Sequence, residues 1–339
     1  MKAMYFSKER VQTLTQELAK LVVVQDLELK ELRCKEGFYL TPAEADAAPA
    51  PYRPFDCASG TWDGIDAHYW FTAQITVPDS FAGKPLWISI STQQEGWDAT
   101  NPQFLFFLNG SATPLQGVDV NHREVLLTRS AEAGAVLRID LQAYTGRQPG
   151  TSVRDAFARE LRVSLMERDP EVEALYYNLT VPNDVAGWLP EGDLHRVKLE
   201  QALNETVNRI DLREPYSPEF YASVQLANDY IAKAVYTDLA GSDEVIATCI
   251  GHTHIDVAWL WTVEQTKEKA ARSFATALKL MEEYPDYKFM SSQPQLYAYI
   301  KERYPEMFET IKKRVEEGRW EVEGGMWLEA DCNLISGES

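Results

Sequence analysis

Residues 245–261 read VIATCIGHTHIDVAWLW and join an apolar run to a cluster of polar and aromatic side chains. The first six residues, Val245–Ile250, have the composition of a short buried parallel strand. His252, His254 and Asp256 follow directly after this run. Imidazole and carboxylate groups together favour a borderline cation such as Zn²⁺. The stretch therefore predicts a metal site at the end of a strand.

The sequence after residue 243 alternates between strand and helix patterns. The predicted segments that follow the first strand are a helix, a strand, two helices and a strand, at Thr262–Glu283, Tyr287–Ser291, Pro294–Arg303, Pro305–Glu317 and Trp320–Glu323. This order implies right-handed crossovers and a parallel sheet or barrel. Active sites of such folds form where the strands end, and His254, Asp256 and Asp331 stand at such positions.

Short apolar and aromatic runs dominate residues 60–170. These runs are His68–Val77, Pro85–Thr92, Gln103–Leu108, Glu124–Leu127, Ala135–Leu141 and Leu161–Glu167. Turn signals such as Asn109-Gly110 separate several of them. This spacing is typical of an antiparallel β-sandwich or jelly roll.

Three further segments complete the expected organisation. Apolar residues at three- and four-residue steps predict a helix over residues 7–31. The connection Thr41–Pro54 is rich in Pro and Ala and is expected to hold neither a helix nor a strand. Residues 170–240 have a helical pattern, and we expect it to break at its prolines. Those prolines are Pro182, Pro190, Pro215 and Pro218.

The predicted fold class is multidomain, with α+β and α/β parts. It comprises an N-terminal helix (residues 1–30), an antiparallel, jelly-roll-like β-sandwich (31–170), a helical linker region (171–242) and the first strands of a truncated parallel β/α barrel (243–339). The barrel segment is expected to be the start of a catalytic domain, because it carries the candidate metal ligands.

Charge and cysteine usage restrict the partners and the compartment. A formal net charge of −19 over 339 residues disfavours nucleic acid and anionic membranes, whereas it is compatible with neutral glycans. No stretch approaches the roughly 20 apolar residues that span a bilayer, and the charged N-terminus lacks a secretory signal. The four cysteines show no CxxC spacing, which indicates free thiols and a cytoplasmic protein.

Residues two apart in an extended segment point the same way, so either His252 with His254 or His254 with Asp256 could face one ion. A pair of hydrogen-bonded histidines without a metal is the structural alternative. A metallo-β-lactamase-type HxHxDH motif would need a histidine where this chain has Val257. An amidohydrolase-type HxH motif would need further histidines, and none follows His254 in this sequence.

A second window, Gly324–Asn333, reads GGMWLEADCN and is continued by Ser336-Gly337-Glu338. Glycines at a strand end permit close backbone approach, and the acids Glu329 and Asp331 follow an indole. An acidic loop without a catalytic role is the plain alternative. The candidate metal ligands His254 and Asp256 precede this window in the same strand–helix segment, which favours a functional role for the two acids.

The two windows together resemble those of glycoside hydrolase family 38, a family of retaining α-mannosidases. The continuation past Asp331 is similar to the cytosolic/vacuolar branch of that family. The resemblance implies that His254 and Asp256 ligate Zn²⁺, with Co²⁺ as an alternative. It also implies that Asp331 is both a zinc ligand and the catalytic nucleophile. Trp259 would pack against the mannose ring, and His252 would support the ligands without binding the metal.

The implied reaction removes terminal α-linked mannose from oligosaccharides through a covalent mannosyl-aspartate intermediate. Family members need a further histidine ligand and a general acid, which are expected beyond Ser339. We therefore expect this chain to be an N-terminal portion that is inactive alone. The resemblance also leads us to expect a homo-oligomer.

Two other functions remain open at this point. The chain could be a carbohydrate-binding or assembly module, whose candidate stacking residues are Trp62, Trp70, Trp87 and Trp97. It could also belong to a metal-dependent amidohydrolase, which would require histidines outside this sequence.

Overall fold

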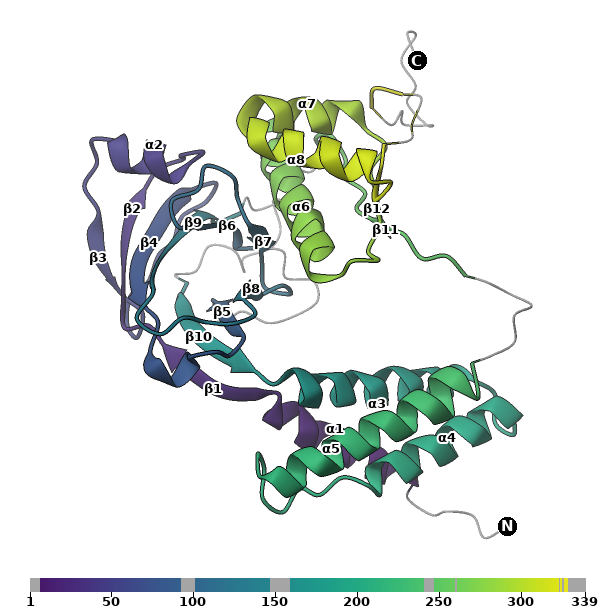
Figure 1. Ribbon diagram of the computed structural model, residues 1–339. Helices are drawn as coiled ribbons and strands as arrows, with labels where there is room; N and C mark the ends of the chain where they lie inside the picture. Colours follow the sequence, from purple (N-terminus) through teal and green to yellow (C-terminus); the bar gives the residue numbers. More distant parts are fainter. Residues whose placement is uncertain are drawn as a thin grey trace. The chain divides into compact units, whose positions relative to one another are not determined.

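The computed structural model describes residues 7–92, 101–146, 159–240, 247–259, 261–322, 324 and 326–328. The chain divides into two compact units (Figure 1). Unit 1 comprises Met1–Leu27, Lys84–Trp87 and Met166–Ala247, and unit 2 comprises Glu28–Gly83, Ile88–Leu165 and Thr248–Ser339. No helix in the described ranges is long and apolar enough to cross a membrane.

Unit 1 is mainly helical. Its helices are α1 (Ser7–Leu21), α3 (Pro170–Trp188), α4 (Leu194–Val207) and α5 (Pro218–Ile231), and a π-helical segment, η3 (Ala232–Thr237), follows α5. Leu18, Leu175, Leu179 and Val224 are fully buried in the shared core. The helical pattern predicted for residues 170–240 is confirmed.

Two predictions about this part of the chain are wrong. The first helix ends at Leu21 rather than near residue 31, and Val23–Glu28 forms strand β1. The reason is that consecutive β-branched valines follow Leu21 and favour an extended backbone. Pro182 lies inside α3 without ending it. Pro182 is buried in the helical packing, which offsets the cost of about 3 kcal/mol for an internal proline.

The largest sheet has six strands in the order β3-β2-β4-β9-β6-β7, and the strand pairings resolved in it are antiparallel. Its strands are β2 (Glu31–Glu36), β3 (Arg53–Asp56), β4 (His68–Thr76), β6 (Gln103–Leu108), β7 (Gln116–Val118) and β9 (Val136–Tyr144). A second sheet has the order β1-β10-β5-β8, with β5 (Leu86–Ser91), β8 (Glu124–Thr128) and β10 (Arg162–Arg168). All six predicted runs are strands, so the antiparallel β-rich region is confirmed.

The prediction for Thr41–Pro54 is wrong. Helix α2 (Pro42–Ala47) begins after Thr41, whose side chain accepts a hydrogen bond from the Glu44 amide. Pro42 occupies the first turn, where its missing N–H costs nothing. Pro54 lies in β3, the edge strand of the six-stranded sheet, and edge strands tolerate proline.

The last hundred residues contain a three-stranded parallel sheet in the order β11-β12-β13. Its strands are β11 (Gly251–His252), β12 (Phe289–Met290) and β13 (Trp320–Glu321), and the helices between them are α6 (Val263–Glu283), α7 (Pro294–Arg303) and α8 (Pro305–Glu316). The alternating order and the parallel pairing are confirmed. The part of the chain that the structure describes contains no closed barrel.

The first parallel strand lies later than predicted, at Gly251–His252 instead of Val245–Ile250. Residues 247–250 are outside the ladder, and 245–246 lie outside the described ranges. The Gly251 amide donates to the Lys288 carbonyl at 2.8 Å. The Tyr287 hydroxyl lies where a Cβ at position 251 would be, so glycine at this position lets the Tyr287 side chain pack against the backbone.

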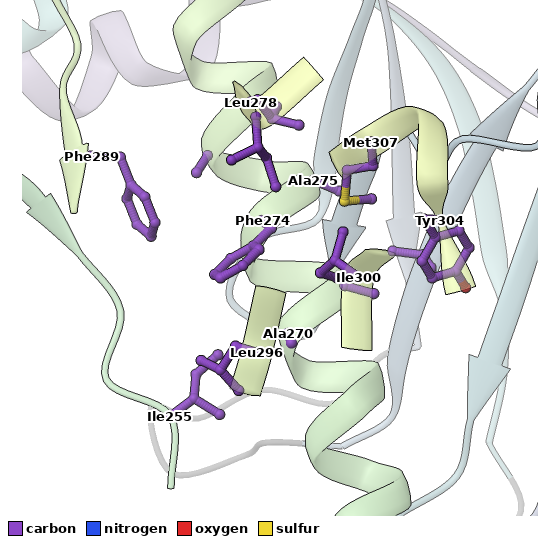
Figure 2. Packing of buried hydrophobic residues seen from close by; sticks show 14 of the residues in the cluster. Ile255, Ala270, Phe274, Ala275, Leu278, Phe289, Leu296, Ile300, Tyr304 and Met307 are labelled. Carbon is purple, nitrogen blue, oxygen red and sulfur yellow. The ribbon is translucent and has the colours of Figure 1, made fainter. Parts of the chain in front are cut away.

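Helix α6 packs on the parallel sheet through Phe274 (Figure 2). The Phe274 ring lies edge-on to Trp320, with centroids 5.1 Å apart, and tilted against Tyr297 at 5.2 Å. Phe289 from β12 completes this buried aromatic group. Ile255, which precedes α6, is 1% exposed and belongs to the same cluster. The core therefore anchors the segment that carries the candidate ligands.

Thr262 caps α6 and should contribute to its stability. Its side chain accepts from the Gln265 amide, and the Gln265 side chain accepts in return from the Thr262 amide. We expect Thr262→Ala to lower the free energy of unfolding by about 1 kcal/mol, because a helix N–H loses its partner. Thermal unfolding should show this loss, whereas Thr262→Ser should remain near wild type. Equal stability of the Ala and Ser variants would contradict the prediction.

Candidate functional site

The candidate site lies in the segment between β11 and α6, residues 253–261, which we call the ligand loop. His254 Nε2 and Asp256 Oδ1 are 2.9 Å apart and form a hydrogen-bonded pair. Their side chains are 53% and 45% exposed. The loop thus presents one imidazole nitrogen and one carboxylate oxygen together, accessible to an ion or a small molecule.

His252 has a different environment. It lies within β11, opposite Met290 of β12, and it is exposed. Of the two pairings that the sequence allowed, the structure brings together His254 with Asp256. This arrangement agrees with a supporting position for His252, whose role stays a prediction.

Trp259 is 70% exposed and lies edge-on to Trp261, with ring centroids 5.6 Å apart and an interplanar angle of 88°. The Lys269 ammonium lies 4.1 Å from the centroid of the Trp261 ring. Burial lowers the pKa of Lys269, and the neighbouring Arg272 guanidinium lowers it further. Trp261 is thus held between a cation and an indole, while Trp259 offers an open aromatic face.

A cleft of about 400 Å³ adjoins the ligand loop within unit 2. His254 lines it together with residues of α6, β12 and the segment around β7. These include Lys269, Arg272, Asp119, Tyr287 and Phe289. Polar groups and aromatic rings therefore surround the exposed imidazole.

The residues just past β12 contact both candidate windows. The Gln293 side chain donates to the Ile255 carbonyl of the ligand loop at 2.7 Å. Two residues later, the Gln295 side chain accepts from Trp327 Nε1 of the second window at 2.8 Å. The carboxyl ends of neighbouring parallel strands meet at one edge of the sheet. The segment that follows β12 therefore contacts both the ligand loop and Trp327 of the second window.

Asp331 and Glu329 lie outside the described residues, so the predicted nucleophile and third ligand stay predictions. Among the described positions, no group of three or more His, Cys, Asp or Glu side chains could hold a metal ion. The structure therefore shows two of the three predicted ligands next to each other, His254 and Asp256.

Of the tryptophans in the β-rich region that could stack against a sugar, two are part of the protein core. Trp62 and Trp70 are buried, and Trp70 Nε1 donates to Asp140 Oδ1 at 3.1 Å. The Arg168 guanidinium lies over the Trp87 ring, 5.0 Å from the centroid of that ring. Trp97 is outside the described ranges. The buried indoles Trp62 and Trp70 have no free face for a sugar.

Sequence reasoning missed Gln293 as part of the site. Gln293 is buried and stands 38 positions after the carbonyl that it binds. A polar residue beside the Pro that opens α7 is an ordinary turn signal. Only the pairing of β11 with β12 shows its partner.

Comparison with known proteins decides the family. Residues 244–339 match the pattern described as the glycosyl hydrolases family 38 N-terminal domain. This segment of the chain belongs to glycosyl hydrolase family 38. It contains both the ligand loop and the second window.

The curated relatives of the chain are named as α-mannosidases. It is 29% identical over 286 residues to "Alpha-mannosidase G" of Dictyostelium discoideum, covering 80% of this chain and 25% of that protein. It is 27% identical over 319 residues to "Alpha-mannosidase 2C1" of Homo sapiens, covering 89% of this chain and 29% of that protein. The chain thus spans 25% to 29% of the length of these relatives.

A β-glucuronidase from Ruminococcus gnavus is a structural match at 9% identity and a TM-score of 0.30, covering 43% of this chain and 30% of that one. A likeness this low supports no conclusion about the chain. The family assignment of residues 244–339 rests on sequence.

Proposed function

We propose that the complete protein is a zinc-dependent retaining α-mannosidase that removes terminal α-linked mannose from oligosaccharides. One observation carries the proposal: within the segment that matches family 38, His254 and Asp256 form an accessible N/O pair at the end of a parallel strand. The names of the relatives support the substrate class.

The donor atoms present suit zinc. Zn²⁺ binds imidazole nitrogen and carboxylate oxygen at about 2.0–2.2 Å, and donors separated by 2.9 Å can both reach one such ion. When bound, zinc would act as a Lewis acid and as a template for the hydroxyls of the sugar. His254 and Asp256 would hold it together with Asp331, and Co²⁺ is compatible with the same ligands.

Asp331 is the proposed nucleophile. Its carboxylate attacks the anomeric carbon as the bond to the leaving oxygen breaks, and a general acid gives that oxygen its proton. Water then gives a proton to the deprotonated general acid, attacks the same carbon and releases mannose with its α-configuration retained, while the Asp331 carboxylate is restored. Trp259 packs against the C–H face of the ring, which its exposed indole can cover.

We also propose a cytoplasmic location and self-association, as the resemblance implies. Cys34 and Cys57 are buried free thiols and Cys249 is an exposed one, which suits a reducing compartment. The negative charge of the chain suits a neutral glycan better than a nucleic acid.

Metal removal from the complete protein tests the proposed function. We expect hydrolysis of an aryl α-mannoside to fall at least about 100-fold after chelation and to return when Zn²⁺ is added. Proton NMR should identify α-mannose as the first product. His254→Ala should lower both zinc content and activity, whereas His195→Ala, which changes an exposed histidine of α4, should lower neither.

Hydrolysis that survives complete metal removal would contradict the zinc-dependent mechanism. Glycan binding without hydrolysis by the complete protein would instead support a carbohydrate-binding module. Cleavage of an amide substrate in place of the mannoside would support the amidohydrolase alternative.

A further inference from the structure

The hydroxyl of Thr266 is the centre of a hydrogen-bond cluster beneath the ligand loop. Thr266 is fully buried on the first turn of α6. Its Oγ1 accepts from the Ala258 amide at 3.0 Å and from Trp261 Nε1 at 3.0 Å. It also lies 3.4 Å from the Asp256 carbonyl and 3.3 Å from the Thr262 carbonyl, either of which can accept its proton.

These contacts use the whole capacity of the hydroxyl. A threonine hydroxyl has two acceptor lone pairs and one donor proton. Ala258 and Trp261 occupy the lone pairs, and the Asp256 and Thr262 carbonyls share the proton. Without this hydroxyl, the Ala258 amide and the Trp261 indole N–H would both lose the partner that they have here.

The bonds act on the backbone next to the proposed ligand. Ala258 has a φ of +63°, a left-handed conformation that a residue with a Cβ rarely adopts. The Thr266 hydroxyl binds the amide of this strained residue, two positions after Asp256. Gln293 also binds the Ile255 carbonyl, so the backbone is held both before and after Asp256.

The same hydroxyl also orients the aromatic pair. Trp261 Nε1 is fixed by Thr266, and Trp259 lies edge-on against the Trp261 ring. The direction of the exposed Trp259 indole therefore depends on a ring that Thr266 holds in place.

We propose that Thr266 is a positioning residue: it holds the ligand loop so that Asp256 can bind the metal and Trp259 can receive the sugar. The metal and sugar roles in this inference rest on the proposed function. The bracing of the loop rests on the hydrogen bonds alone.

The test compares three variants of the complete protein. Thr266→Val keeps the shape and removes the hydroxyl, Thr266→Ser restores the hydroxyl, and Thr206→Val is a matched control. Thr206 is also fully buried in a helix, α4, and its hydroxyl donates to the carbonyl of Ala202, four residues earlier. Zinc affinity is measured by competition with a chromophoric chelator, and amide exchange over residues 256–261 is measured in the metal-free protein.

We expect Thr266→Val to weaken zinc binding by about 10- to 100-fold, the range typical for residues that orient metal ligands. Amide exchange over residues 256–261 should speed up about tenfold or more. Thr266→Ser and Thr206→Val should stay within about twofold of wild type in both measurements.

Unchanged exchange and zinc affinity in Thr266→Val would overturn the proposal. An equal loss in Thr206→Val would also overturn it, because the effect would then be general destabilisation. If the wild-type protein binds no zinc, the proposed function fails. The exchange comparison needs no metal and would still decide whether Thr266 holds the loop.

Discussion

Replacing Asp331 with Asn in the complete protein should reduce α-mannoside hydrolysis by about 10⁴-fold or more, as expected for loss of a catalytic nucleophile. Asn has nearly the same shape as Asp but carries no charge, so it cannot form the glycosyl ester or bind zinc as a carboxylate. Steady-state hydrolysis of an aryl α-mannoside measures this loss. Mass spectrometry of the wild-type protein with a fluorinated mannosyl fluoride should show a mannosyl adduct on the peptide that contains Asp331.

Asp286→Asn is the matched control. It makes the same change at an exposed position between α6 and β12. We expect its activity to stay within about twofold of wild type, as for surface substitutions in general. An Asp331→Asn enzyme of normal activity, or an adduct on another carboxylate, would show that the nucleophile is elsewhere.

Replacing Glu268 with Ala should destabilise unit 2 by about 3 kcal/mol, because it leaves a buried group without its ionic partner. The Glu268 carboxylate is 3% exposed and lies 3.0 and 3.1 Å from His68 Nε2. It is also 3.7 Å from the Arg272 guanidinium. Burial lowers the pKa of Arg272, and the Glu268 carboxylate opposes that shift. Removing Glu268 therefore takes from a buried cation the carboxylate that most opposes the shift of its pKa.

Urea unfolding of the protein measures this loss as a lower transition midpoint. Glu309→Ala is the matched control, because Glu309 pairs with Lys312 where both side chains are more than half exposed. Such surface pairs contribute at most about 1 kcal/mol. Equal midpoints for the two variants would show that the His68–Glu268–Arg272 group is not a significant stabilising contact.

Local sequence patterns predicted most of the elements correctly. Helix α6 begins at the capping box of Thr262 and Gln265, which is a signal contained within four residues. The Asn109-Gly110 turn after β6 has φ values of 54° and 71°, as such a dipeptide favours. Signals of this kind depend on near neighbours, so a single sequence contains them.

Predictions failed where distant contacts outweighed a local preference. Pro182 is expected to break a helix, yet the packing of unit 1 keeps α3 continuous through it. Pro54 sits in a strand because β3 is at the edge of its sheet, and an edge position depends on the whole strand order. The first parallel strand begins at Gly251 because its position is set by pairing with β12, where Gly251 lies opposite Phe289.

The sequence by itself determined which chemical groups the candidate site contains. Imidazole, carboxylate and indole groups follow an apolar run in residues 245–261, and their order predicted both a strand end and an N/O metal site. The family assignment of residues 244–339 depends on the same information.

Only the tertiary structure decided how these groups are arranged. It pairs His254 with Asp256 rather than with His252, and it brings the Gln293 side chain to the ligand loop and sets the Thr266 hydroxyl beneath it. The physical reason is that buried polar groups such as those of Gln293 and Thr266 need partners, and the partner is set by which strands and helices pack together. Residues far apart in the sequence become neighbours only when β11, β12 and α6 assemble.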